Sequence, residues 1–185
     1  PFVTELKQHL ERIAEPLVLH YRVDAGYLPP DHWLQDPTQG GGRLLGEACH
    51  FVDLLIYLTG SVPQSVTSLA LPDAGRYSGD NLLITLEFAD GSLGSLTYVA
   101  NGDRGLGKEF LEVFGGGLSA RLDDYRRLEI RRGSTKVKRV ARLRQDKGHR
   151  AEWQAWVAHL TGSGPLPITF EEIVYSTKAT LAAQH

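Results

Sequence analysis

The stretch QGGGRLLGEACHFVDLLIYLTG, residues 39–60, is the most informative part of this 185-residue chain. Three glycines precede a predicted helix at about residues 43–58, and apolar side chains occupy almost every side of that helix. Such a helix is normally buried. Glu47, His50 and Asp53 nevertheless follow at three-residue spacing along one flank. Because ionisable groups are costly to bury without partners, this polar flank predicts a site.

Outward from this helix, the chain is mostly strand. Further helices are predicted at residues 2–13, 149–160 and 170–183, the last with Thr169 as its N-cap. Strands are predicted at residues 17–23, 65–71, 81–88, 92–99, 110–114, 119–122, 128–132 and 136–142. The Ala89-Asp90-Gly91 segment predicts a hairpin turn. Because the strands are consecutive, we expect an α+β domain over residues 1–185: a mostly antiparallel, open-faced sheet with helices packed on one face.

Composition narrows the function classes. The chain is 42% hydrophobic and 23% charged, with a net charge of −2, which is typical of a globular domain. Residues 121–150 hold twelve Lys/Arg against four Asp/Glu. This basic segment indicates a solvated hairpin or a contact with phosphate or an acidic partner. Aromatic residues are scarce there, so nucleic acid is not expected. We also expect no membrane span and, from the single cysteine, Cys49, a reducing cytoplasmic location.

Several familiar motifs are absent or incomplete. No glycine-rich turn of the dinucleotide-binding type follows a strand and opens a helix. Residues 102–108 have the glycine and lysine spacing of a phosphate-binding loop, but Glu109 stands where a Ser or Thr is needed. Glu47 and His50 match half of a di-iron signature whose second half is missing. Zinc-ligand spacing is also absent, so no metal site is predicted.

The same residues resemble a known family. The triple glycine, His50 and Asp53 are similar to the central helix of the Gfo/Idh/MocA oxidoreductases (glucose–fructose oxidoreductase, inositol dehydrogenase, rhizopine catabolism). Other segments resemble the family in order along the chain: residues 33–37, 88–92, 108–115, 146–152 and 167–169. Only the family's C-terminal domain is represented. We therefore interpret the chain, which lacks methionine, as a piece of a longer protein.

The resemblance implies a function for the whole protein. An N-terminal Rossmann domain, absent from this chain, would hold NAD or NADP and the catalytic lysine. This domain would bind a sugar, inositol or related polyol and form a homo-oligomer through the open face of its sheet. Without the cofactor domain, the fragment itself is predicted to be inactive. One departure from the family's pattern stands out: the usual aspartate four residues before the histidine is Gly46 here, and Glu47 follows it.

His50 is the predicted catalytic residue, because imidazole can accept a proton near neutral pH during alcohol oxidation. The alternative is a buried structural histidine. Glu47 either orients His50 or binds a substrate hydroxyl, or else is a buried acid paired with an arginine. Arg43, one turn earlier, is that arginine or reaches the substrate. Asp53 is interpreted as structural, and Cys49 as a small buried filler.

The remaining predicted substrate-binding residues precede the helix. Gly41 and Gly42 either expose N–H groups to a polar ligand or form a turn that needs positive φ. Trp33 either lies on a sugar face or packs in the core. A second function class stays open throughout: a non-catalytic binding or assembly module that kept the fold and lost the chemistry. Gly46 supports this second hypothesis, whereas Glu47 beside His50 opposes it.

Overall fold

The computed structural model describes residues 1–36, 38–73, 75–77, 79–103, 105–141 and 145–184. Pro37, Arg104 and Arg142, which belong to segments discussed above, lie outside these ranges. The helical elements are α1 (Phe2–Leu10), a 3₁₀ turn η1 (Trp33–Gln35), a π-helical turn η2 (Leu44–Ala48), α2 (Cys49–Thr59), α3 (His149–Leu160) and α4 (Phe170–Ala182). The strands are β1 (Val18–Asp24), β2 (Pro63–Ala70), β3 (Leu82–Phe88), β4 (Leu93–Val99), β5 (Glu109–Gly115), β6 (Leu118–Asp123), β7 (Arg127–Arg132) and β8 (Thr135–Val140).

All eight strands form one sheet in the order β2-β3-β4-β1-β5-β6-β7-β8. Every neighbouring pair is antiparallel except β1 and β4, which run parallel with Tyr21 opposite Leu96. The α+β prediction of a mostly antiparallel open sheet is therefore confirmed. β1 lies between β4 and β5, so the first strand of the chain is inserted into the middle of the sheet.

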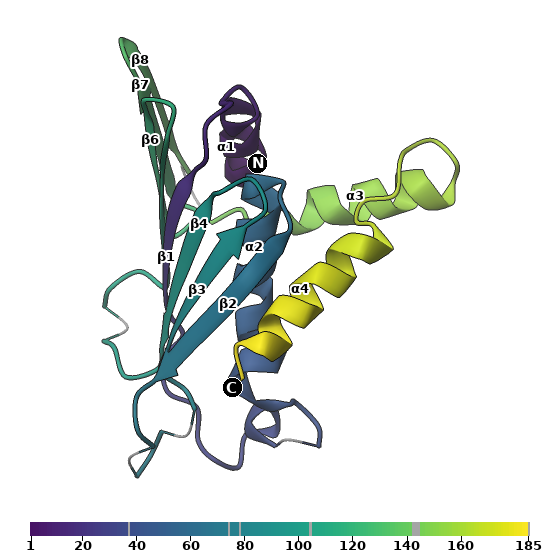
Figure 1. Ribbon diagram of the computed structural model, residues 1–185. Helices are drawn as coiled ribbons and strands as arrows, with labels where there is room; N and C mark the ends of the chain where they lie inside the picture. The colour runs from purple at the N-terminus through teal and green to yellow at the C-terminus, as the bar shows by residue number, and fades with distance from the viewer. Residues whose placement is uncertain (37, 74, 78, 104, 142–144, 185) are drawn as a thin grey trace.

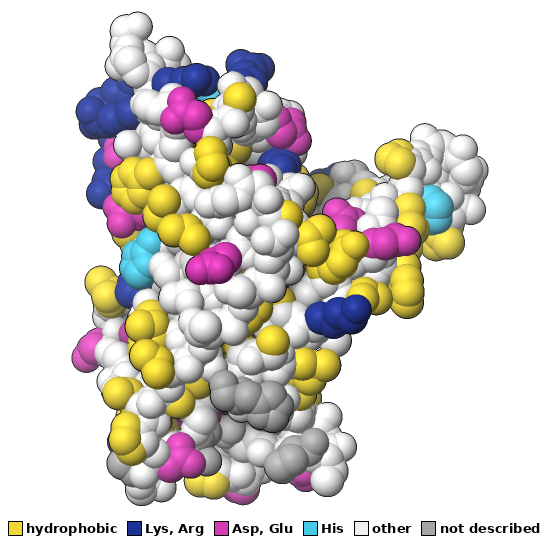
Figure 2. Space-filling model, viewed as in Figure 1, with side chains coloured by type: hydrophobic (Ala, Val, Ile, Leu, Met, Phe, Trp, Pro, Cys, Tyr) yellow, Lys and Arg dark blue, Asp and Glu magenta, His cyan; other side chains and the backbone are white. Residues whose placement is uncertain are grey.

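Helices α1, α2 and α4 lie on one side of the sheet, and α3 extends away from the body (Figure 1). On β3 the residues Leu82, Ile84, Leu86 and Phe88 face these helices and are buried. Leu83, Thr85 and Glu87 alternate with them and are exposed on the opposite side. We call that second side the open face; apolar and polar side chains are mixed on it (Figure 2).

The helix boundaries follow from local chemistry. Gly60 ends α2 in a left-handed conformation with φ 68°, as predicted. Thr169 caps α4 with a capping box in which its side chain and that of Glu172 bond each other's backbone N–H. In the described ranges, no helix is both long and apolar enough to cross a bilayer.

The prediction of a regular helix from Arg43 was wrong for its first turn. Leu44–Ala48 is π-helical, and the N–H of Cys49 bonds both the Glu47 and the Leu44 carbonyl where the regular helix begins. π-Helical turns are rare and occur often at functional sites. The predicted first helix also ends earlier, at Leu10, where the Ile13 N–H instead closes a turn on the Leu10 carbonyl.

The basic segment forms a hairpin at the end of the sheet. β7 and β8 pair antiparallel, with Ile130 opposite Val137, and most of β8 is exposed. Lys and Arg side chains gather over this end of the molecule (Figure 2). The solvated-hairpin interpretation agrees with this placement.

Candidate functional site

The triple glycine forms a tight turn before the central helix. Gly41 and Gly42 have φ of 72° and 82°, which only glycine adopts without strain. The N–H groups of Gly40 and Gly41 donate to the Asp36 carbonyl at 2.9 and 3.1 Å. These donors are therefore occupied within the chain, which favours the turn interpretation over the ligand-binding one.

Gly41 and Gly42 also lie apart from His50. They line a cavity of about 530 Å³ beside the C-terminal end of α4, together with Ser68 and Ala183. His50 does not line it. The structure therefore does not bring these two predicted substrate-binding glycines together with the predicted catalytic histidine.

Glu47, on the π-helical turn, holds three donors. Its Oε1 accepts from Lys108 Nζ at 2.6 Å, and its Oε2 accepts from the Tyr98 hydroxyl at 2.7 Å and lies 3.0 Å from Arg43 Nη2. Arg43 is only 2% exposed and also donates to the Tyr98 hydroxyl and the Gly26 carbonyl. We call Arg43, Glu47, Tyr98 and Lys108 the Glu47 cluster.

These contacts set the protonation states of the cluster. Burial raises the pKa of Glu47, but hydrogen bonds from Lys108 and Tyr98 outweigh it, so the net pKa is lowered. Burial and the Glu47 carboxylate both raise the pKa of Tyr98, whose hydroxyl therefore stays protonated. Among the described residues, no hydrogen bond joins Glu47 to His50. The arrangement matches the alternative of an acid paired with an arginine.

Gly46, where the resemblance predicts an aspartate, has no room for a side chain. A Cβ at this position would overlap Leu34 Cδ1 and lie 2.8 Å from the Gly40 carbonyl oxygen. Leu34 itself is buried. Leu34 therefore occupies the space that an acidic side chain at position 46 would need. Glu47 does not take over that place, because its carboxylate binds Lys108, Tyr98 and Arg43.

His50, in the first turn of α2, is exposed, so the alternative of a buried structural histidine is wrong. It lies where two cavities adjoin. The smaller, about 310 Å³, is lined by His50, Asp53, Leu54, Ile56, Tyr57, Tyr125, Pro167, Ile168 and Glu172. The larger, about 460 Å³, is lined by Tyr21, Glu47, His50, Phe51, Leu54, Lys108, Glu109, Tyr125, Lys147, His149 and Glu152. Both volumes fall in the range of about 300–1,000 Å³ typical of small-molecule sites.

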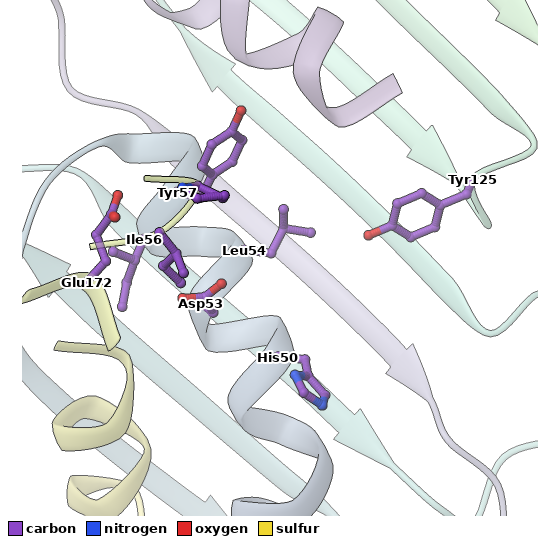
Figure 3. A pocket seen from close by; sticks show the side chains of 9 residues that line it. His50, Asp53, Leu54, Ile56, Tyr57, Tyr125 and Glu172 are labelled. Atoms are coloured by element: carbon purple, nitrogen blue, oxygen red, sulfur yellow. The ribbon is translucent and has the colours of Figure 1, made fainter. Parts of the chain in front are cut away.

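Figure 3 shows the smaller cavity, with His50 projecting from α2 and the hydroxyl end of Tyr125 directed toward that helix. Asp53 lies one turn after His50. Burial raises the pKa of Asp53, while a hydrogen bond with Ser176 of α4 acts in the opposite direction. This link between two helices agrees with the structural interpretation of Asp53, although the residue also lines the cavity.

A second carboxylate, Glu109 at the start of β5, is 4% exposed. It accepts hydrogen bonds from the Tyr21 hydroxyl and from Lys147 Nζ, the latter at 2.5 Å. Burial is the main cause that raises the pKa of Tyr21, with the negative charge of Glu109 adding to it. We call Glu109, Tyr21 and Lys147 the Glu109 cluster. It faces the larger cavity from the sheet and from the loop before α3.

Two other predicted residues lie elsewhere. Trp33, in η1, is 58% exposed, so the core-packing alternative was wrong, and it lines neither cavity beside His50. Cys49 is partly buried, and burial raises the pKa of its thiol, in keeping with a filler role.

Sequence reasoning missed Lys108, Glu109, Lys147 and Tyr125. Lys108 and Glu109 were noticed in a failed phosphate-loop pattern and, like Lys147, in segments that resemble the family, but none was predicted as a site residue. The signal that identifies Lys108 and Glu109 is the strand pairing: the Asp24 N–H bonds the Lys108 carbonyl, which places the end of β1 beside the start of β5. Lys108 Nζ then reaches Glu47, just before α2. Across the described parts of the chain, no three His, Cys, Asp or Glu side chains are grouped as metal ligands.

Solved structures share the fold. An NAD-binding oxidoreductase from Klebsiella pneumoniae matches with a TM-score of 0.80 and 20% identity, over 100% of this chain and 60% of that chain. A levoglucosan dehydrogenase in complex with NADH and levoglucosan matches with a TM-score of 0.77 and 16% identity, over 97% and 59%. A UDP-N-acetylglucosamine 3-dehydrogenase from Acidithiobacillus ferrooxidans matches with a TM-score of 0.72 and 16% identity, over 100% and 58%.

This chain therefore spans about three fifths of the length of those proteins. Among curated proteins, none matches the sequence. The family described as "Oxidoreductase family, C-terminal alpha/beta domain" (GFO_IDH_MocA_C) matches residues 7–184. The chain thus belongs to the Gfo/Idh/MocA oxidoreductase family, of which it is a C-terminal α/β domain.

Proposed function

We propose that this domain is the substrate-binding part of an NAD(P)-dependent dehydrogenase that oxidises or reduces a sugar, inositol or related polyol. The observation that carries the proposal is the position of His50, an exposed imidazole where two cavities meet, one of them lined by two paired carboxylates. Levoglucosan and UDP-N-acetylglucosamine dehydrogenases with this fold support the substrate class.

His50 carries the proton in this reaction. During oxidation of an alcohol, the imidazole takes the hydroxyl proton as the C–O bond becomes C=O, and in the reverse reaction it returns that proton. Glu47 and Glu109 do not compete for this role, because each is already held by a lysine and a tyrosine hydroxyl. They instead supply fixed charges around the substrate.

A nicotinamide cofactor supplies the hydride acceptor or donor when bound. The turn before the central helix does not fit a dinucleotide, because the Gly40 and Gly41 N–H groups already donate to the Asp36 carbonyl. We therefore assign NAD or NADP mainly to an N-terminal Rossmann domain outside this chain. Titration calorimetry of residues 1–185 with NADH and NADPH is expected to show no saturable binding. Low-micromolar affinity for either would contradict this assignment.

The test of the function is turnover by the whole protein. NAD⁺ and NADP⁺ are offered with myo-inositol, D-glucose, levoglucosan and UDP-N-acetylglucosamine, and reduced cofactor is followed by absorbance. We expect cofactor reduction with at least one of these hydroxyl substrates. Absence of turnover with all of them, in both directions, would reject the proposed function.

One observation favours the second candidate, a non-catalytic module. Gly46 leaves no space for the family's aspartate, and Glu47 is bound to other partners. If the chemistry has been lost, a sugar or polyol would bind to the whole protein without any cofactor reduction. Calorimetry with the same four compounds separates this outcome from catalysis.

We also propose that the domain forms a homo-oligomer through the open face. Its exposed apolar residues, Val18, Leu83, Leu93 and Phe114, alternate with polar ones, giving the mixed surface of a non-obligate interface. Sedimentation at tens of micromolar tests this proposal. Thr85→Arg should weaken association, whereas an unchanged profile would place the interface elsewhere, and a monomeric wild type would reject it.

A further inference from the structure

The turn between β6 and β7 holds the residues that point to a further role. The Arg126 N–H donates to the Asp123 carbonyl at 2.8 Å and closes the turn. Its central residues, Asp124 and Tyr125, have φ of 46° and 52°. Across the described residues they alone adopt positive φ without being glycine. Aspartate tolerates this left-handed conformation, whereas a bulky aromatic residue does so only under strain.

The two neighbouring hairpin turns place glycine at positions with positive φ. Between β5 and β6, the central residues are Gly116 and Gly117, with φ of 53° and 70°. Between β7 and β8, Gly133 takes the position with φ 57°. Glycine is thus used at both adjacent turns, and the turn after β6 keeps a tyrosine at a position that favours glycine or asparagine.

In this strained turn, the side chain of Tyr125 reaches the cavities beside His50. It is partly buried and lines both cavities that flank His50. Lys147 Nζ lies 5.3 Å from its ring centroid, a distance that permits a cation–π contact. Burial, with a contribution from Glu109, raises the pKa of Tyr125 to about 12, while a hydrogen bond with the Tyr21 hydroxyl acts in the opposite direction, so the Tyr125 hydroxyl is protonated at neutral pH. In Figure 3 that hydroxyl points toward α2.

Packing alone accounts poorly for this choice. Part of the ring rests against the core, and its hydroxyl is hydrogen-bonded with that of Tyr21, but a residue chosen only for stability would also relieve the turn. Strained conformations persist where the side chain is needed for another purpose, and they concentrate at binding and catalytic sites. An aromatic ring with a hydroxyl suits a polyhydroxylated ring, because its face covers the ligand's C–H groups and its hydroxyl bonds one of the ligand's oxygens.

We propose that Tyr125 is a specificity-determining residue that contacts the substrate from the sheet side of the cavity, facing His50. This inference rests on the proposed function, since it assigns Tyr125 to the same sugar or polyol site. It predicts that the strained turn is retained for substrate selection. Removal of the Tyr125 side chain should therefore weaken substrate binding without lowering the stability of the fold.

The experiment compares three variants of the whole protein. Tyr125→Gly removes the side chain and the strain together. Tyr125→Phe keeps the ring, its packing and the strain. Asp124→Gly is the matched control, because it loosens the same turn but leaves Tyr125 in place, and Asp124 lines neither cavity. Each is assayed for Tm and for KM and kcat with NAD⁺ or NADP⁺ and the four compounds named above.

For Tyr125→Gly we expect a Tm no lower than that of the wild type and a KM at least tenfold higher, with a smaller change in kcat. Asp124→Gly should keep KM within about twofold. Tyr125→Phe, which also loses the hydrogen bond with Tyr21, should alter the ratio of kcat/KM between two of the compounds while lowering Tm by no more than about 2–4 °C. This ratio remains a test if the glycine variant does not fold.

Unchanged KM values in Tyr125→Gly would overturn the inference. So would a Tyr125→Gly variant that does not fold together with a Tyr125→Phe variant whose ratio of kcat/KM between compounds equals that of the wild type. Both results would show that Tyr125 is a packing residue. The wild type separates this failure from that of the proposed function: turnover by the wild type with unaffected variants rejects only the role of Tyr125. A wild type that turns over none of the compounds rejects both.

Discussion

The two carboxylates beside His50 are held in similar ways but over different cations. Glu47 binds Arg43, Lys108 and Tyr98, and Arg43 is 2% exposed. Glu109 is the more deeply buried acid, yet its cation, Lys147, has a side chain that is 34% exposed. Loss of the Glu47 carboxylate would leave the buried Arg43 guanidinium without a counter-charge. Loss of Glu109 would free a lysine that can turn into water.

The difference shows how charge is distributed around the site. Both acids are committed to internal pairs, and their tyrosine partners have raised pKa values. His50 is exposed and lines the larger cavity together with members of both clusters. We infer that the two clusters shape the cavity and that His50 carries the proton. Three predictions test this difference between the paired acids and the histidine, from the largest expected effect to the smallest.

The largest effect is expected for His50→Ala in the whole protein. Loss of a general base lowers the rate by about 10²- to 10⁴-fold, while removal of an exposed imidazole should hardly change Tm. His159→Ala is the control, because His159 lies on α3 and lines neither cavity beside His50; its kcat should stay near that of the wild type. Unchanged kcat in His50→Ala would shift the preference to the non-catalytic module.

The second prediction compares Glu47→Gln with Glu109→Gln by denaturant unfolding. Glu47→Gln should cost about 2–4 kcal/mol, because it leaves the buried Arg43 charge without a counter-charge. Glu109→Gln should cost about 1–2 kcal/mol, mainly from the weakened hydrogen bond of the buried Tyr21 hydroxyl. The reverse order would mean that burial of the acid, and not of its cation, determines the stability of each cluster.

The smallest effect concerns pH. The folded-state pKa of Glu47 is lowered from its ordinary value of 4.5. Its contribution to stability is therefore fully present above pH 4.5 and is lost as the pH falls through the folded-state pKa. Each unit of such a shift corresponds to about 1.4 kcal/mol. Unfolding free energies at neutral and acidic pH should differ less in Glu47→Gln than in the wild type.

Asp53 provides a control of opposite sign. Its pKa is raised by burial from the ordinary value of 3.8, so its contribution is present below that pH and is lost as the pH rises through the folded-state value. Asp53→Asn should therefore increase the gain in stability between acidic and neutral pH. An equal response of both variants would show that neither pair governs the pH dependence.

Much of the fold was predictable because it depends on local patterns. Alternation along residues 81–88 predicted a half-buried strand, and β3 occupies Leu82–Phe88 with its apolar set facing the helices. Thr169 and Gly60 were read correctly as helix ends. The π-helical turn was not predictable, since its hydrogen bonds depend on how Leu44–Ala48 lies over the sheet.

The site was predictable only in part. The pairing of Glu47 with an arginine was one of the alternatives. Helical spacing favours it, because Arg43 and Glu47 are four residues apart and lie on the same side of a helix. The Glu47 partners Tyr98 and Lys108 are distant in sequence, on β4 and immediately before β5. No local pattern joins them. Trp33 shows the opposite failure: its apolar character suggested the core, but the turn at η1 leaves it in solvent.

By itself, the sequence determined the fold class, the family and the place of His50 on the central helix, because periodicity, capping and the triple glycine act over a few residues. Only the tertiary structure decided which acids are paired, why Gly46 is glycine, that His50 is exposed and that Tyr125 lines the same two cavities as His50. Those features require β1 to enter the sheet between β4 and β5, which brings together side chains that are up to about a hundred positions apart along the chain. Contacts at such separation leave no periodic trace in a single sequence.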